Sequence, residues 1–387
     1  MRMICRNSLA WALGIYGICG LAGCGEKQEP IVEKAPSELQ YESGMKALKE
    51  GNRSLAKGSF DTAIRLNPSF APATFALAEL EVRSGNAPQA IERLESLKRA
   101  APKTPHVSCR ISAVKAGSGR FVYGFMAAKL AIADEPVCPL ARTEYAVQIA
   151  ASGDRQQALK LLDALHRENL RDNRVSLLMV ELLARNGKPD AAWTQLDSMP
   201  EEPKIAFQVN YLRGWLMEKY GRQGKKDGVL AQKQVDAALA ISPENGPANQ
   251  EKGRLLLQSG DAKTAQKYLS KAASVSLPNY DLLMAMAETQ ARLKNPAAQK
   301  LMISASKFGK LVDELYAARQ AFVKDVTNRN AILKLAPLEA AIGNGLDGQE
   351  LLTELLKRNP NDPDALRFMT PDAPQGNAAT LRSQKGK

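Results

Sequence analysis

The sequence has few of the residues on which most enzymes and metal sites depend. Its 387 residues include 2 histidines and 5 cysteines, and aromatic side chains make up 5%. No His-Glu-x-x-His, Cys-x-x-Cys or phosphate-binding glycine-rich loop is present. His106 and His166 are expected to be helix-capping or surface residues and not ligands. We therefore expect no catalytic site, no metal site and no cofactor.

Long apolar runs are also lacking. The run at 9–20 holds about a dozen residues, whereas a membrane-spanning helix needs roughly 20. Arg2 and Arg6 precede this run, and small residues follow it. A basic start, a short apolar stretch and small residues near a cleavage point are typical of a secretory signal.

The end of the signal is more specific. Leu21, Ala22, Gly23 and Cys24 resemble the lipobox of bacterial lipoproteins. The resemblance implies cleavage before Cys24, a thioether from its sulfur to diacylglycerol, and acylation of the new N-terminus. Gly25 at the next position is similar to the sorting signal for the outer membrane of Gram-negative bacteria. The expected location is the periplasmic face of that membrane; the alternative is an ordinary signal with a chance cysteine.

Removal of residues 1–23 changes the charge and the cysteine count. The whole chain has 53 basic and 41 acidic residues, and cleavage takes away Arg2 and Arg6 but no acid, so the mature net charge falls from +12 to +10. Residues 24–36 are polar with two prolines and predict a flexible tether. With Cys24 lipidated, Cys109 and Cys138 are the remaining thiols, in a compartment where disulfides persist.

A repeat of about 34 residues begins at residue 37. Ala56, Phe60, Ala63 and Pro68 have the spacing of the second helix and stop of a tetratricopeptide repeat. The small-residue, turn and stop positions recur in later units, with these matches: Ala78, Gly85, Ala90, Pro102, Gly119, Ala131, Pro136, Ala146, Gly153, Ala158, Gly187, Ala192, Gly253, Gly260 and Ala265. Each unit is too small to bury a core alone, so neighbouring units must stack.

The chain resembles the tetratricopeptide-repeat family over residues 37–362, although most units lack the Trp and Tyr of the family pattern. The resemblance implies an all-α fold, a right-handed superhelical solenoid with a concave inner face. We expect five units at 37–206, central units at 207–313 with an insertion at 221–228, and C-terminal helices with a degenerate repeat and cap at 314–369. A separate additional helix is expected at 314–328, and a disordered tail at 370–387.

In the family, positions 2, 5, 9, 12 and 13 of each first helix line the groove. Transferring that register predicts a partner-binding face at these residues: Tyr41, Met45, Phe75, Arg83, Arg185, Tyr211, Trp215, Arg254, Met284 and Arg292. Large aromatic and Arg side chains are typical of binding hot spots. The alternative is that some of them pack between units and that the Arg side chains are only solvated.

Cys109 and Cys138 form the remaining pair of interest. Antiparallel helices bring the start of a first helix near the end of the second, so a disulfide between them is geometrically allowed. Two separate buried thiols are the alternative.

Two functions remain after an enzyme is set aside. The first is a scaffold that binds envelope proteins in an assembly, export or secretion system, with exopolysaccharide and protein sorting slightly favoured by resemblance. The second is direct binding of cell-wall polymer or anionic polysaccharide by a basic concave face. Nucleic acid is not an expected partner, because a lipid-anchored periplasmic protein does not routinely meet it.

Overall fold

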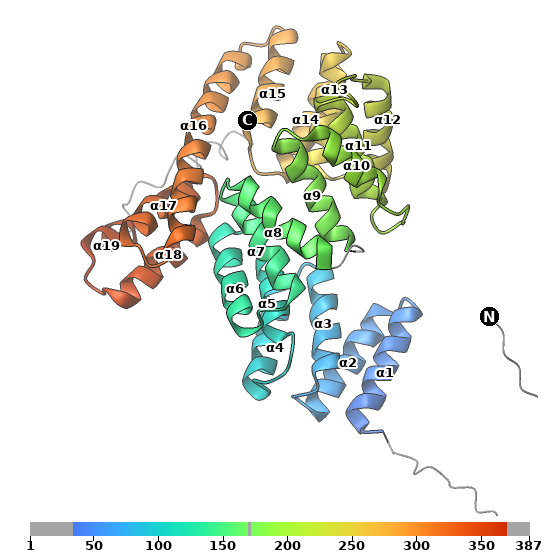
Figure 1. Ribbon diagram of the computed structural model, residues 1–387, viewed down its shortest axis with the longest axis vertical. Coiled ribbons are helices and arrows are strands. Elements are labelled where there is room, and N and C mark those ends of the chain that lie inside the picture. The colour runs from blue at the N-terminus through green and yellow to red at the C-terminus, as the bar shows by residue number, and fades with distance from the viewer. Residues whose placement is uncertain (1–33, 169–171, 370–387) are drawn as a thin grey trace, which may run out of the picture.

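The computed structural model describes residues 34–168 and 172–369, which fold into helices joined by short turns (Figure 1). The first helices of the repeats are α1 (Pro36–Lys49), α3 (Ala71–Arg83), α5 (Val107–Ala116), α7 (Pro139–Ala151), α9 (Asn173–Arg185), α11 (Ala206–Lys219), α13 (Gly246–Gln258), α15 (Tyr280–Arg292) and α17 (Arg329–Ala341). The second helices are α2 (Arg53–Leu66), α4 (Ala87–Ala100), α6 (Phe121–Asp134), α8 (Arg155–Glu168), α10 (Pro189–Asp197), α12 (Gly228–Ile241), α14 (Ala262–Val275), α16 (Ala297–Lys324) and α18 (Gly345–Arg358). The short helix α19 (Pro363–Met369) follows as the expected cap. The predicted signal at 1–23 and the tail at 370–387 lie outside the described residues.

The turns between the helices of each pair confirm the repeat register. A glycine with positive φ stands in the turn of the first six units, each 34 residues after the last: Gly51, Gly85, Gly119, Gly153, Gly187 and Gly221. Glycine takes this conformation without the steric cost that a Cβ brings, which is why it ends the first helix. Gly224 also has positive φ within the insertion at 221–228, and because of this insertion the turn glycine of the next unit, Gly260, comes 39 residues after Gly221. In the eighth unit Lys294 takes the positive φ, where no glycine is present.

Small residues set the distance between paired helices. A Cβ on Gly44 would lie 2.4 Å from the ring of Phe60, and one on Gly253 would lie 2.5 Å from Leu269. Ala158, at the small position of the second helix α8, is fully buried. Larger side chains at these places would force the helices apart.

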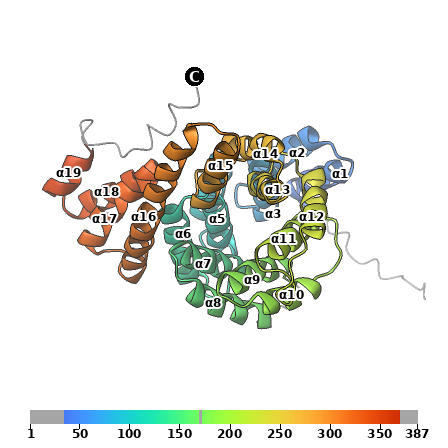
Figure 2. The ribbon, with the colours of Figure 1, turned by 90° about the horizontal axis from the view of Figure 1, so that it is seen from above.

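The helix pairs stack into a superhelix. Seen from above, α7, α9, α11 and α13 lie on the inner side of the curve, and α8, α10 and α12 lie on the outer side (Figure 2). The first helices therefore line the concave face, as the family register implies.

The structure corrects one element. The additional helix expected at 314–328 is not separate, since α16 runs unbroken for 28 residues from Ala297 to Lys324. The boundary predicted at 313/314 therefore falls inside a helix. Residues 297–324 contain no Gly-Pro break, only Gly309, which a helix tolerates. The first part of α16 pairs with α15, and its last turns pack on α17 and on the third and fourth repeats.

These last turns close the solenoid onto itself. One hydrophobic cluster joins side chains of α6, α7 and α8 to side chains of α16, α17 and α18. Phe125 of α6 is fully buried and meets Phe322 of α16 edge to face, with ring centroids 6.0 Å apart. In an open solenoid each repeat contacts only its neighbours. Here the C-terminal helices also contact repeats about 200 positions earlier in the chain.

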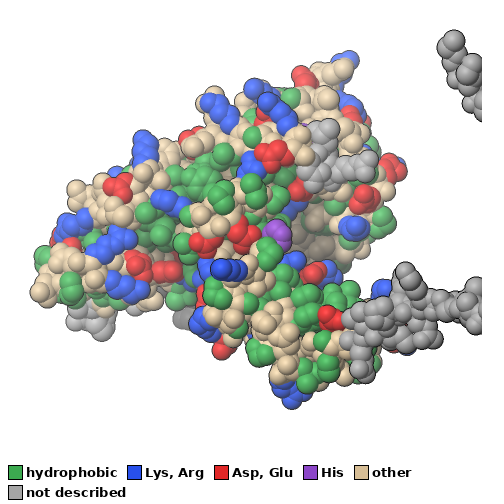
Figure 3. All heavy atoms as spheres, turned by 60° about the horizontal axis from the view of Figure 1, so that its bottom comes forward, with side chains coloured by type: hydrophobic (Ala, Val, Ile, Leu, Met, Phe, Trp, Pro, Cys, Tyr) green, Lys and Arg blue, Asp and Glu red, His purple; other side chains and the backbone are tan. Residues whose placement is uncertain are grey.

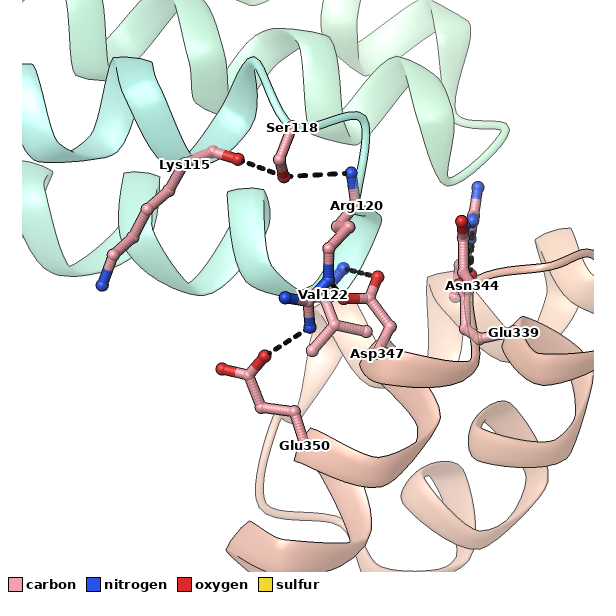
Figure 4. A network of polar contacts seen from close by, with 9 residues as sticks. Lys115, Ser118, Arg120, Val122, Glu339, Asn344, Asp347 and Glu350 are labelled. Carbon is pink, nitrogen blue, oxygen red and sulfur yellow. Dashed lines mark hydrogen bonds and ion pairs between the residues drawn. The ribbon is translucent and has the colours of Figure 1, made fainter. Parts of the chain in front are cut away.

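A polar network borders this contact (Figure 4). Asp347 of α18 is fully buried and accepts a hydrogen bond from the Val122 amide at 2.9 Å, at the first turn of α6. It also accepts from Arg120 Nε at 2.9 Å, while the same guanidinium reaches Glu350 at 2.8 Å. Arg120 precedes α6 without capping it. The Asp347 carboxylate, from a distant part of the chain, thus accepts a hydrogen bond from a backbone amide in the first turn of α6 that has no partner within the helix.

A second buried ion pair, between Arg319 and Glu339, lies near the pair of Arg120 and Asp347. Arg319 of α16 donates two hydrogen bonds to Glu339 of α17, at 2.6 and 2.8 Å, and a third to the Ala151 carbonyl at the end of α7. Glu339 is fully buried and Arg319 is 8% exposed. The guanidinium also lies over the ring of Phe121, 4.4 Å from its centroid. Arg319 therefore connects the consecutive helices α16 and α17 to α7, which lies 168 positions earlier in the chain.

Candidate partner-binding face

The N-terminal part of the predicted face is largely used for packing. Tyr41 is half-buried, and its ring lies 5.7 Å from both Phe60 and Phe70. Phe75 is half-buried beneath the guanidinium of Arg110, which lies 4.3 Å from its ring centroid. These aromatic rings pack against other side chains of the solenoid. In the same region, Met45 is half-buried on the cluster that includes Phe60, and Arg83 is exposed and paired with Glu79 at 2.5 Å.

The prediction that Trp215 offers an open contact surface is wrong. Its side chain is 5% exposed and belongs to the core formed by α9 to α13. Tyr220 packs against it edge to face at 5.6 Å, and the guanidinium of Arg185 covers it at 5.4 Å. Position 9 of the sixth repeat faces inward along the curve, but the neighbouring helices pack over a side chain as large as that of Trp215. Tyr211, one turn earlier, is half-buried and stacks on Phe207.

The arginines of the face are paired with acids. Arg185 donates to Glu181 at 2.8 Å, and Arg292 donates to Glu288 at 2.6 Å. Arg254 of α13 reaches across to Glu218 of α11 at 3.0 Å. In the described part of the chain, the four predicted arginines therefore sit beside carboxylates. At these four positions the concave face is therefore mixed in charge.

An acidic pair lies beneath Arg254, and it was not predicted. Glu218 and Glu251 are each 3% exposed, and each has one carboxyl oxygen without a hydrogen-bond partner. Burial and the neighbouring Glu218 carboxylate raise the pKa of Glu251 to about 8. Burial also raises the pKa of the Tyr211 hydroxyl, with a smaller contribution from Glu251. The sequence signal was weak, because isolated Glu residues on consecutive first helices are normally solvated.

Stability is expected to depend on the protonation of Glu251. Its folded pKa of about 8 lies above the value of about 4.3 expected in the unfolded chain. Between these values the folded state binds the extra proton, so stability falls as pH rises and the full cost is reached above about pH 8. Glu251→Gln should unfold at similar urea concentrations at about pH 5 and about pH 9, whereas the wild type should lose stability at the higher pH. Glu181→Gln, an exposed control, should behave like the wild type; a flat wild-type profile would contradict the assignment.

A groove opens beside the acidic pair, between α13, α15 and α16. Its volume is about 520 Å³. It is lined by Arg254, Leu257, Gln258, Asp281, Met284, Ala285, Ala287, Glu288, Ala291 and Met302. Met284 was predicted for this face, whereas Met302 was not. Met302 is 52% exposed and comes from α16, whose second-helix pattern was too irregular to place it.

The two cysteines and two histidines are placed as follows. Cys109 and Cys138 form a disulfide between α5 and the start of α7, with Cα atoms 6.2 Å apart. His106 is the N-terminal cap position of α5, with its imidazole near Glu135. His166, near the end of α8, has Nδ1 3.4 Å from the Ser176 hydroxyl.

Within residues 34–168 and 172–369, no helix combines the length and apolar character needed to cross a membrane.

Comparison with known proteins agrees with this architecture. The tetratricopeptide repeat family model matches residues 47–108. The human IFIT1 dimer with PPP-AAAA is similar over 81% of each chain, with a TM-score of 0.51 and 12% identity, which shows a shared fold. A tetratricopeptide repeat protein from Parabacteroides merdae matches 66% of this chain and 100% of its own, with a TM-score of 0.44 and 14% identity. PilF of Pseudomonas aeruginosa matches 66% and 96%, with a TM-score of 0.36 and 17% identity. No curated protein matches the sequence.

Proposed function

Because the chain is a solenoid of tetratricopeptide repeats, we propose that it is a scaffold that binds proteins of the bacterial envelope in the groove between α13, α15 and α16. Repeat solenoids of this kind present extended concave surfaces to other proteins. We place the scaffold at the periplasmic face of the outer membrane, anchored through Cys24, in an export or assembly pathway. Exopolysaccharide export and protein sorting remain the first pathways to examine.

The composition of the groove is the observation that carries this proposal. Met284 and Met302 both line the groove, together with the charged side chains of Arg254, Asp281 and Glu288. Methionine is flexible and polarizable, so it adapts to different apolar side chains of a partner. Arg254, Asp281 and Glu288 supply both signs of charge, which suits the polar backbone and mixed side chains of a protein.

The charge pattern favours a protein over an anionic polymer. The four arginines of the predicted partner-binding face are paired with Glu79, Glu181, Glu218 and Glu288. On the face drawn in Figure 3, Lys and Arg side chains are scattered among Asp and Glu side chains and do not gather in one field. A polymer held mainly by charge would need unpaired cations in a continuous row.

The position of the first helix supports the proposed anchor. Cys24 lies outside the described residues, and α1 begins at Pro36. The polar residues between them would place the N-terminal repeats near the membrane and leave the groove at the seventh and eighth repeats of the solenoid. Two or more acyl chains are needed for stable anchoring, as a fully acylated Cys24 would provide.

The test is crosslinking in cells followed by recovery of the protein from envelope fractions. Met284→Glu combined with Met302→Glu should lower the recovery of bound proteins by about 10-fold or more, since loss of two apolar contacts costs at least about 1.4 kcal/mol. Val229→Glu combined with Ile241→Glu is the matched control, because both residues are exposed on the outer helix α12. Both double variants should retain the helical signal and melting temperature of the wild type.

Two further measurements separate the parts of the proposal. Cys24→Ser should abolish labelling by palmitate and release the protein from the membrane fraction without changing the groove. Equal labelling of both proteins would contradict the anchor. If polysaccharide, and not protein, is recovered and is lost steeply with added salt, the scaffold function is wrong and the polymer-binding alternative holds.

A further inference from the structure

His106, Cys109 and Glu135 bring their metal-binding atoms together where α5 begins and the α6–α7 turn ends, and Cys138 is bonded to Cys109. Cys109 lies in the first turn of α5, and Cys138 is the residue that precedes α7. Both are at most 2% exposed, and their Cα atoms are 6.2 Å apart. His106 precedes α5, and Glu135 follows α6. The four residues come from two adjacent turns and converge at one end of the third repeat.

His106 and Glu135 are held beside the cysteine pair. The backbone N–H of His106 donates to Glu135 Oε2 at 2.8 Å, and the imidazole Nδ1 lies 3.5 Å from the same oxygen. One donor atom each of His106, Cys109 and Glu135 lie within 4.8 Å of one another. Among the residues that the structure describes, His106 is one of three non-glycine residues with positive φ. A disulfide between Cys109 and Cys138 requires neither the imidazole nor the carboxylate.

We propose that the reduced form of the chain binds one Zn²⁺ between Cys109, Cys138, His106 and Glu135. Two thiolates, one imidazole nitrogen and one carboxylate oxygen are a ligand set that suits tetrahedral Zn²⁺. The side chain of His106 is 64% exposed, which leaves an entry path for the ion, whereas the sulfur atoms are buried. The site would join the start of α5 to the α6–α7 turn in the same place as the disulfide.

The disulfide and the zinc site exclude each other. The metal requires both sulfur atoms as thiolates, and the disulfide uses both for one bond. An external disulfide is the oxidant that converts one form into the other. One cysteine thiolate attacks it and expels a first thiolate; the second cysteine then attacks the mixed disulfide and expels another. The two electrons reside on the two released thiolates, and Zn²⁺ leaves as an ion.

The experiment uses the full chain with Cys5, Cys19 and Cys24 replaced by Ser, so that Cys109 and Cys138 are its only thiols. After reduction with a phosphine and removal of excess ZnCl₂, elemental analysis should find one Zn²⁺ per chain. The oxidised chain should hold none. Titration with Co²⁺ should give thiolate-to-metal charge-transfer bands and the intense visible bands of a tetrahedral site.

Variants distinguish the proposed ligands from adventitious binding to two thiols. Cys109→Ser should abolish the charge-transfer bands, and His106→Asn and Glu135→Gln should each lower Zn²⁺ affinity by about 10-fold to 100-fold. His166→Asn is the matched control and should bind like the unsubstituted chain. Circular dichroism should show equal helix content in all variants. The proposal is overturned if the reduced chain holds no Zn²⁺, or if His106→Asn and Glu135→Gln both bind it unchanged.

Discussion

Replacing Arg319 with Met is expected to lower the free energy of unfolding by about 3–5 kcal/mol. The change leaves the Glu339 carboxylate buried without its partner, and it removes the hydrogen bond to the Ala151 carbonyl. Breaking a buried pair from one side is costly because the remaining charge has lost its hydration and gained nothing in return. Urea unfolding followed by circular dichroism measures the effect.

An exposed ion pair provides the control. Arg167 pairs with Asp163 one turn earlier on α8, and its side chain is 76% exposed. Arg167→Met should change stability by no more than about 0.5 kcal/mol, because water screens such a pair. Adding Glu339→Leu to Arg319→Met should restore part of the loss, since no buried charge then remains. Equal unfolding of Arg319→Met and Arg167→Met would contradict the role assigned to the buried pair.

Phe322→Ala is expected to destabilise the protein by about 3–5 kcal/mol, the usual cost of emptying a buried aromatic site. Phe322 is 1% exposed. It packs from α16 against the aromatic cluster of the third repeat, which contains Phe121 and Phe125. Because the cavity would open between segments about 200 residues apart, the C-terminal helices should lose their contact with α6. Relative to the wild type, hydrogen exchange should then speed up by a larger factor in α17 and α18 than in α1 to α4.

Phe368→Ala is the matched control, because Phe368 lies on α19 and is 37% exposed. It should cost well under the loss seen for Phe322→Ala. A double-mutant cycle with Phe125→Leu and Phe322→Leu should give a coupling energy of about 0.5–1.5 kcal/mol for the ring pair. If the coupling is absent, the closure of the solenoid does not depend on this contact.

The contacts between the C-terminal helices and the third and fourth repeats change how the solenoid is expected to unfold. An open array loses stability repeat by repeat, since each unit depends only on its neighbours. Contacts from α16 and α18 to α6 and α7 add long-range terms that are gained or lost together. The segment from α6 to α18 should therefore unfold as one unit, with the first two repeats as a less protected extension.

Much of the local structure was readable in the amino-acid order. The turn glycines, the small residues such as Ala158 and the prolines that open or stop helices recur at one period, and each acts on atoms within a few residues of itself. For that reason the helix pairs and the insertion at 221–228 were predicted from the spacing and its resemblance to the tetratricopeptide-repeat pattern, and a short cap was expected to follow them at 363–369. The predicted signal and lipobox at residues 1–24, which lie outside the described residues, are likewise short linear patterns of the kind that processing enzymes read.

Tertiary structure decided the rest. Whether Trp215 faced a partner or the core depended on how closely α9 and α13 approach α11, which no local pattern encodes. The raised pKa of Glu251 needed Glu218 on another helix and the burial of both. The capping of α6 by Asp347 and the pairing of Arg319 with Glu339 and Ala151 join segments whose separation follows from the curvature of the whole superhelix. The repeating sequence determines how each repeat packs on the next. Which distant side chains meet depends on the curvature that results when all the repeats are stacked.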